Sequence, residues 1–271
     1  MTLYLVGLGL DDEKDITVKG LEIVKRSDLV YLEHYTSILG IEKETLEKFY
    51  AKPVLLADRG LVETRAEEEL LLPAKTKDVA LLVVGDPFGA TTHTDLVLRA
   101  GALGVRVEIV HNASIMDAVG EIGLERYKYG KTTSIPFWDE GFEPETAYGV
   151  IKENAARGCH TLCLLDIKVA EPSKEDLLKG AEGKAVQPRF MTVNEALKIL
   201  LEIEKRRNEG VLSPDTLAVG VARLGQRDHV IVAAPIGVLL AHDFGAPLHS
   251  LIVPGTLQAM EEEALVRWKI A

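Results

Sequence analysis

The sequence is poor in cysteine and tryptophan, with two of each among 271 residues, and it has no long apolar run. The longest such run, residues 230–241, is interrupted by Pro235 and Gly237, whereas a membrane-spanning helix needs about 20 apolar residues. The apolar start, residues 1–10, lacks a basic segment and leads directly into the acidic residues 11–13, so we expect a first strand rather than a signal peptide. We therefore expect a cytoplasmic protein with no membrane partner.

Positive charge is also scarce relative to negative charge. Lysine and arginine total 31, aspartate and glutamate total 42, and the formal net charge is −11. Because an acidic surface repels a phosphate backbone, this balance disfavours a nucleic acid as partner. The 47% hydrophobic content allows a packed core and excludes a disordered chain. The length suits one large domain or two of about 100–150 residues.

The two cysteines give no sign of a disulfide or a metal site. Cys159 and Cys163 lie four residues apart in an apolar run that predicts a strand, which places them on one face roughly 13 Å apart. A disulfide cannot span that distance. His160 would point to the opposite face, which disfavours zinc. We expect two buried core thiols and no metal.

Several catalytic and cofactor motifs are absent or broken. Gly7-Leu-Gly9-Leu10 follows a predicted strand, but Asp12 stands where a dinucleotide fingerprint needs its third glycine, and no helix begins at the turn. The sequence contains no phosphate-binding loop of the Gly-x-x-x-x-Gly-Lys type and no Gly-x-Ser-x-Gly nucleophile turn. A nicotinamide enzyme and a serine hydrolase are both disfavoured.

Alternating apolar and amphipathic segments predict two α/β domains, residues 1–112 and 113–271. In the first, repeated strand–helix–strand units predict a mostly parallel sheet. The predicted strands are 3–8, 28–33, 53–57, 78–84 and 105–110, and the predicted helices are 17–26, 41–50, 63–72 and 92–103. Capping-box spacing marks three helix starts, at Thr92/Asp95, Ser114/Asp117 and Thr192/Glu195.

The second domain is predicted to contain a mixed sheet. Strands 216–222 and 229–234 are too close for a helical crossover, so they should pair antiparallel. Pro144 suits the first position of a helix. Residues 171–189 contain little that could be buried and are predicted to form a surface excursion. The remaining predicted strands are 132–136, 160–167 and 248–253, and the helices are 144–157, 192–207 and 257–268.

Two segments at predicted strand ends are candidates for ligand binding. Residues 85–93 (Gly-Asp-Pro-Phe-Gly-Ala-Thr-Thr-His) and 112–118 (Asn-Ala-Ser-Ile-Met-Asp-Ala) each follow a strand and lead into a helix. Parallel sheets bind ligands at the carboxyl ends of their strands. Asp86 supplies an acidic group beside glycines that let the backbone approach a ligand. An ordinary turn and a simple helix cap remain the alternatives.

Together with other stretches, these segments resemble the class III, tetrapyrrole-methylase-like S-adenosyl-L-methionine-dependent methyltransferases, and within them the diphthine synthases. The resemblance is collinear over nearly the whole chain. It is carried by residues 6–10 (Val-Gly-Leu-Gly-Leu), 15–22 (Asp-Ile-Thr-Val-Lys-Gly-Leu-Glu), 35–37 (Tyr-Thr-Ser), 85–87 (Gly-Asp-Pro), 90–93 (Ala-Thr-Thr-His), 165–168 (Leu-Asp-Ile-Lys) and 251–255 (Leu-Ile-Val-Pro-Gly).

The resemblance implies a homodimer in which each chain folds S-adenosyl-L-methionine between two α/β domains and releases S-adenosyl-L-homocysteine. It implies transfer of three methyl groups to the amino group of a 3-carboxy-3-aminopropyl-histidine on translation elongation factor 2. A precorrin or uroporphyrinogen methylase and a non-catalytic binding module remain alternatives. The implied cofactor contacts, with no catalytic residue among them, are Leu10, Asp86, Gly89, Ser114, Ile115, Leu165, Leu224 and His249.

Overall fold

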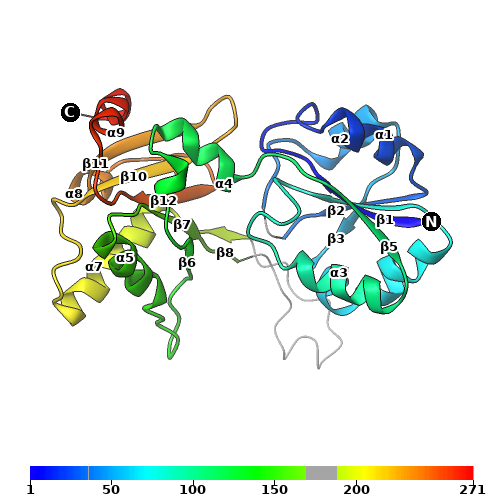
Figure 1. Ribbon diagram of the computed structural model, residues 1–271, viewed down its shortest axis with the longest axis horizontal. Coiled ribbons are helices and arrows are strands. Elements are labelled where there is room, and N and C mark those ends of the chain that lie inside the picture. Colours follow the sequence, from blue (N-terminus) through cyan, green and yellow to red (C-terminus); the bar gives the residue numbers. More distant parts are fainter. Residues whose placement is uncertain (36, 169–187, 271) are drawn as a thin grey trace. The chain divides into compact units, whose positions relative to one another are not determined.

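The computed structural model describes residues 1–35, 37–168 and 188–270, and the chain divides into two compact units (Figure 1). Unit 1 comprises residues 1–118 and 225–227, and unit 2 comprises residues 119–224 and 228–271. Each unit contains its own five-stranded sheet. The mixed α/β class predicted from the sequence is confirmed, whereas the division after residue 112 stays a prediction.

The sheet of unit 1 is entirely parallel, with strand order β3-β2-β4-β1-β5. All five residues of β4 are buried, as a continuous apolar run predicts for a central parallel strand. Its strands are β1 (Thr2–Gly7), β2 (Leu29–Glu33), β3 (Leu55–Ala57), β4 (Val79–Val83) and β5 (Arg106–Val110), and its α-helices are α1 (Val18–Arg26), α2 (Lys43–Tyr50), α3 (His93–Ala102) and α4 (Ile115–Ala118).

The helix predicted at residues 63–72 is replaced by wider turns. Two π-helical segments, Gly60–Thr64 and Glu67–Leu71, precede a 3₁₀ turn at Pro73–Lys75. The i→i+5 hydrogen bond from the N–H of Arg65 to the carbonyl of Gly60 measures 2.9 Å. This geometry buries Leu61, Val62, Leu70 and Leu71, which explains why apolar periodicity alone misjudged the type of helix.

Unit 2 contains the predicted mixed sheet, in the order β11-β10-β12-β7-β6. In this sheet β6 and β7 pair in parallel and the other neighbouring strands pair antiparallel, among them β10 and β11, as their short connection predicts. In the described residues of this unit, the strands are β6 (Thr133–Ile135), β7 (Thr161–Leu165), β8 (Ile167–Lys168), β9 (Arg189–Phe190), β10 (Leu217–Ala222), β11 (Val230–Pro235) and β12 (His249–Val253), and the α-helices are α5 (Thr146–Ala156), α7 (Val193–Arg207), α8 (Ile236–Leu239) and α9 (Ala259–Leu265).

Several local predictions in unit 2 were wrong. The strand predicted at 160–167 breaks at Asp166, whose carboxylate accepts the N–H of Phe137 at 2.9 Å. Cys159 precedes β7 and is half-buried, so only Cys163 is a core thiol; burial raises its pKa to about 12. Pro144 lies before α5 rather than at its first position.

Two predicted capping boxes had different outcomes. The hydroxyl of Thr192 accepts the N–H of Glu195, whose carboxylate accepts the N–H of Thr192, so that box is confirmed. Thr92 makes no side-chain cap, because its backbone (φ −99°, ψ 7°) is not extended, and Asp95 pairs with Arg99 instead. Of the predicted excursion at 171–189, residues 171–187 lie outside the described residues and Arg189 belongs to β9.

Within the described ranges, no helix has the length and apolar content needed to span a membrane. The same residues contain no group of three or more His, Cys, Asp or Glu side chains arranged to hold a metal ion.

Candidate functional site

Three loops meet at the carboxyl edge of the unit 1 sheet, because β1, β4 and β5 are parallel neighbours and end together. The first two loops contact each other through the backbone. The N–H of Gly85 donates to the carbonyl of Gly9 at 2.7 Å, and the N–H of Gly9 donates to the carbonyl of Gly85 at 3.3 Å. Both residues have φ +80°, a conformation that favours glycine.

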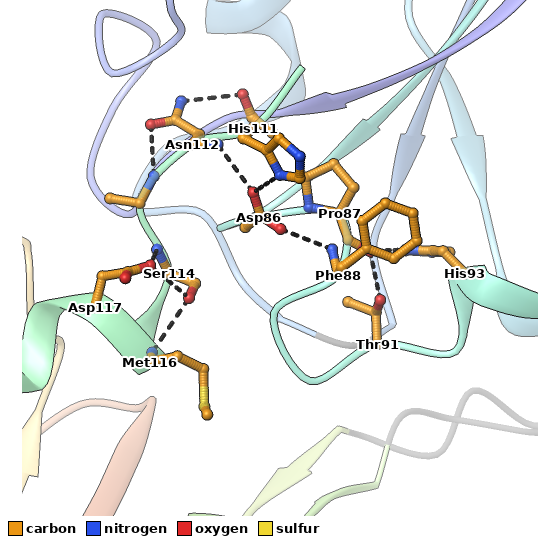
Figure 2. A network of polar contacts seen from close by, with 12 residues as sticks. Asp86, Pro87, Phe88, Thr91, His93, His111, Asn112, Ser114, Met116 and Asp117 are labelled. Atoms are coloured by element: carbon orange, nitrogen blue, oxygen red, sulfur yellow. Dashed lines mark hydrogen bonds and ion pairs between the residues drawn. The ribbon is translucent and has the colours of Figure 1, made fainter. Parts of the chain in front are cut away.

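Asp86 joins the loop after β4 to the loop after β5 (Figure 2). Its Oδ1 accepts the N–H of Phe88 at 2.9 Å. Its Oδ2 accepts Nδ1 of His111 at 2.8 Å and the N–H of Asn112 at 3.1 Å. Three donors therefore fix the carboxylate, whose side chain is 13% exposed, while the side chain of His111 is 70% exposed.

Asn112 links these loops through contacts that its sequence neighbourhood did not predict. Its Nδ2 donates to the carbonyl of Gly7 at 3.0 Å and to the carbonyl of Asp15 at 2.9 Å. Its own N–H donates to Asp86. These partners are 26 to 105 positions away in the chain, so no local pattern signals the role; only its place in the loop after β5 made it a candidate.

Gly89 and Ser114 bring the second and third loops into close approach. A Cβ atom at Gly89 would lie 2.8 Å from Cβ of Ser114, so only glycine fits there. Ser114 is 3% exposed, and its hydroxyl accepts the N–H of Met116 at 3.2 Å (Figure 2). Asp117 accepts the N–H of Ser114 at 3.4 Å. The predicted helix start at Ser114 is confirmed, with Ile115 as the first residue of α4.

Leu10 is held in the first loop by contacts at both its backbone ends. Its N–H donates to Oδ2 of Asp15 at 3.1 Å, and its carbonyl accepts Nε2 of Gln226 at 3.3 Å. A Cβ atom at Gly225 would lie 2.7 Å from that of Leu10. Residues 225–227, which belong to unit 1, therefore pack directly against this loop.

The other three predicted positions lie at one edge of the unit 2 sheet. Leu165 ends β7, His249 begins β12, and Leu224 follows β10. Because β12 is antiparallel to both β7 and β10, these ends coincide. Nδ1 of His249 accepts the N–H of Val193 at 3.3 Å, and its Nε2 donates to the carbonyl of Ala246 at 3.1 Å. Burial lowers the pKa of His249, which favours the neutral imidazole.

Arg223 is a second structural residue whose role the sequence did not signal. Its φ of +51° is unusual for a residue with a side chain. Its Nε pairs with Oδ2 of Asp228 at 2.8 Å, and its Nη1 donates to the carbonyls of Phe244 and Ala246. The guanidinium thus connects the loop of Leu224 to the loop that precedes His249.

The structure therefore groups five predicted positions in unit 1 and three in unit 2. The unit 1 group combines an anchored carboxylate, close-packed glycine backbone, a buried hydroxyl and the apolar side chains of Leu10 and Ile115. Such a set suits a ligand with both a polar, charged part and an apolar part.

Comparisons with known proteins agree with one another on the family of this chain. The family model for tetrapyrrole (corrin/porphyrin) methylases matches residues 2–239. A diphthine methyl ester synthase from Dictyostelium discoideum is 50% identical over 272 residues, 100% of this chain and 99% of that protein. The diphthine methyl ester synthase of Homo sapiens is 51% identical, over 99% of this chain and 95% of that protein. A crystal structure of diphthine synthase superposes with a TM-score of 0.84 at 37% identity, over 99% and 96% of the two chains.

Proposed function

The chain belongs to the tetrapyrrole (corrin/porphyrin) methylase family and is an S-adenosyl-L-methionine-dependent methyltransferase, and from this premise we propose that it acts in diphthamide biosynthesis. The proposed substrate is the 3-carboxy-3-aminopropyl-histidine of translation elongation factor 2, whose amino group receives three methyl groups. The observation that carries the proposal is the identity of about half of all residues, across the full chain, with proteins named diphthine methyl ester synthase.

The names of these two relatives include a methyl ester. This supports a further transfer to the carboxylate of the same arm, in addition to the three transfers to its amine. We also propose a cytoplasmic homodimer, as the resemblance implies; sedimentation of the purified protein at about twice the mass of one chain would support the dimer.

The proposed cofactor contacts come from both domains, residues 1–112 and 113–271. We propose that S-adenosyl-L-methionine is held by Leu10, Asp86, Gly89, Ser114, Ile115, Leu165, Leu224 and His249. The anionic Asp86, fixed by its own loops, suits the polar or cationic part of this cofactor, and Leu10 and Ile115 suit its apolar surface. Gly89 has no side chain, which lets its loop pack closely against Ser114 of the next loop at the proposed site.

Methyl transfer of this kind makes modest chemical demands on the protein. The cofactor supplies a methyl group already activated on a sulfonium, and the acceptor attacks it in line with a lone pair. Holding the two in that geometry can supply much of the rate enhancement. The amine must first lose its proton, and partial desolvation lowers the pKa of an amine. None of the eight proposed contacts is needed as a general base.

Methylation of defined acceptors tests the proposal. We would incubate the purified protein and methyl-labelled cofactor with elongation factor 2 that carries the unmethylated arm, and in parallel with uroporphyrinogen and a precorrin. We expect label only in elongation factor 2, with a mass gain of four methyl groups, of which alkaline hydrolysis removes the ester methyl alone. Label in a tetrapyrrole would contradict the proposal, and cofactor binding without turnover on any acceptor would favour a non-catalytic module.

A further inference from the structure

The imidazole of His111 belongs to the unit 1 group of site residues and is largely open to solvent (Figure 2). His111 directly follows β5, and 70% of its side chain is exposed. Its Nδ1 lies 2.8 Å from Oδ2 of Asp86, and because an ionised carboxylate only accepts hydrogen bonds, Nδ1 carries a hydrogen. In the neutral ring, Nε2 then holds a lone pair.

Two contacts orient this ring and leave its Nε2 without a partner. The first is the bond to Asp86, whose carboxylate is itself fixed by the N–H groups of Phe88 and Asn112. The second is the ring of Phe88, whose centroid lies 6.3 Å from that of His111. Nε2 makes no hydrogen bond or ion pair with any residue that the structure describes. A basic nitrogen is therefore oriented, exposed and available to a ligand.

A histidine whose Nδ1–H is held by a carboxylate and whose Nε2 is free has the arrangement of a general base. The carboxylate selects the tautomer and stabilises the imidazolium that forms when Nε2 takes a proton. We propose that His111 is the general base of methyl transfer and that its Nε2 accepts the proton which the ammonium of the acceptor arm must lose. The inference rests on the proposed function and adds a catalytic residue outside the eight cofactor positions.

The bond to Asp86 places this base beside the proposed cofactor site. Asp86 is one of the eight proposed cofactor contacts, so His111 is one hydrogen bond away from a residue that touches the cofactor. The acceptor amine has to approach the cofactor for transfer in line, which brings it to the same loops. The negative charge of Asp86 also attracts an ammonium group to this position.

The proton and electron balance of the step is complete. An N–H bond of the ammonium breaks, its electron pair stays on nitrogen, and its proton binds Nε2 of His111. The freed lone pair forms the new N–C bond as the S–C bond breaks, and that electron pair stays on sulfur. Because the imidazole is exposed, it releases the proton directly to solvent before the next transfer.

The proposed transfers differ in their need for a base. Each of the three transfers to nitrogen starts from an ammonium that must lose one proton. The transfer to the carboxylate of the same arm needs no base, because a carboxyl group is already ionised at neutral pH. Loss of the base should therefore slow the three transfers to nitrogen and spare ester formation, whereas a purely structural defect would slow both.

The variant His111→Asn removes the base and keeps the contact with Asp86. The amide N–H of the new side chain can replace Nδ1–H, and Asp86 retains the N–H groups of Phe88 and Asn112. In calorimetry we expect a Kd for S-adenosyl-L-homocysteine within about threefold of the wild type, and in turnover a kcat for transfer to the amine lowered about 100-fold, as for a lost general base.

Two further measurements separate catalysis from support of the loop. With elongation factor 2 whose arm already carries three methyl groups, we expect His111→Asn to form the ester at the wild-type rate. Added imidazole should restore part of the transfer to the amine, because the shortened, exposed side chain leaves room for it. His229→Asn is the matched control, since Nε2 of His229 also lies beside a carboxylate, 3.4 Å from Oε1 of Glu121 in unit 2. It should equal the wild type with both acceptors.

The outcomes distinguish this inference from the proposed function. Wild-type protein that fails to methylate elongation factor 2 would overturn both. Active wild-type protein together with an equally active His111→Asn variant would overturn the inference alone, as would a variant that loses ester formation in parallel with transfer to the amine. If the wild type forms no ester, the response to imidazole decides: rescue supports the inference, and its absence overturns it.

Discussion

Three donors from two loops converge on the Asp86 carboxylate, so this residue both shapes the candidate site and supplies it with charge. The Gly-Asp-Pro sequence was enough to predict a polar turn at a strand end. It was not enough to predict the partners, because His111 and Asn112 are 25 and 26 positions away. Long-range polar contacts of single residues depend on the fold, which explains why the partners of Asn112 were not predicted.

The contribution of Asp86 to the affinity for the cofactor product can be measured by removing the charge of its side chain. Asp86→Asn keeps the size but loses one accepting oxygen, so the loops after β4 and β5 should separate. We expect the Kd for S-adenosyl-L-homocysteine to rise about 10- to 100-fold in calorimetry, as a lost hydrogen bond to a charged group costs about 1.5–3 kcal/mol. Asp139→Asn makes the same change in charge at an exposed ion pair with Lys168 and should leave Kd unaltered. Equal affinities for all three proteins would count against Asp86 as a contact.

At the scale of helices and strands, the sequence predicted those features that depend on residues close together in the chain. The capping box at Thr192 formed because the residue is extended (ψ 159°) and faces the first turn of α7. The same spacing at Thr92 failed, because the preceding loop is fixed by bonds from Thr91 and His93 to the carbonyl of Pro87. The parallel and antiparallel pairings followed from connection lengths, whereas the π-helical turns at Gly60–Thr64 did not follow from apolar spacing.

The end of α7 gives a prediction about stability and pH. Glu204 accepts the hydroxyl of Tyr148 at 2.7 Å and the N–H groups of Gly210, Val211 and Leu212 at 2.7–2.9 Å. Desolvation on its own raises the pKa of this carboxyl, but these hydrogen bonds outweigh it and lower the pKa to about 2. The stabilisation is therefore complete above the ordinary pKa of about 4.5 and is lost as pH falls toward 2.

Replacing Glu204 should reproduce that loss at neutral pH. We expect Glu204→Gln to lower the free energy of unfolding by about 1–3 kcal/mol in urea titrations at pH 7, since its amide would face N–H donors. The difference from the wild type should shrink between pH 4.5 and 2. Glu202→Gln lies on the same helix at an exposed pair with Arg206 and should cost less than about 0.5 kcal/mol. A difference that persists unchanged at low pH would contradict this account.

At the scale of the whole chain, two unlike sheets were predictable because each half has its own pattern of connections. The assignment of residues 225–227 to unit 1 was not, because it depends on contacts between Gly225 or Gln226 and Leu10, more than 200 positions earlier. The proposed cofactor positions divide in the same way, five in one unit and three in the other. A single ligand that contacts all eight should therefore affect both units.

Hydrogen exchange with and without S-adenosyl-L-homocysteine tests whether the ligand contacts the proposed positions in both units. Binding stabilises the whole native state, which slows only the amides that exchange through global unfolding. Loop amides exchange through local opening, so they should be slowed only where the ligand makes contact. We expect protection at residues 85–89 and 114–115 in unit 1, and around Leu165, Leu224 and His249 in unit 2, while exposed amides of α2 and α9 stay unchanged. Protection confined to unit 1 would remove Leu165, Leu224 and His249 from the site and leave Asp86 and its neighbours as the binding group.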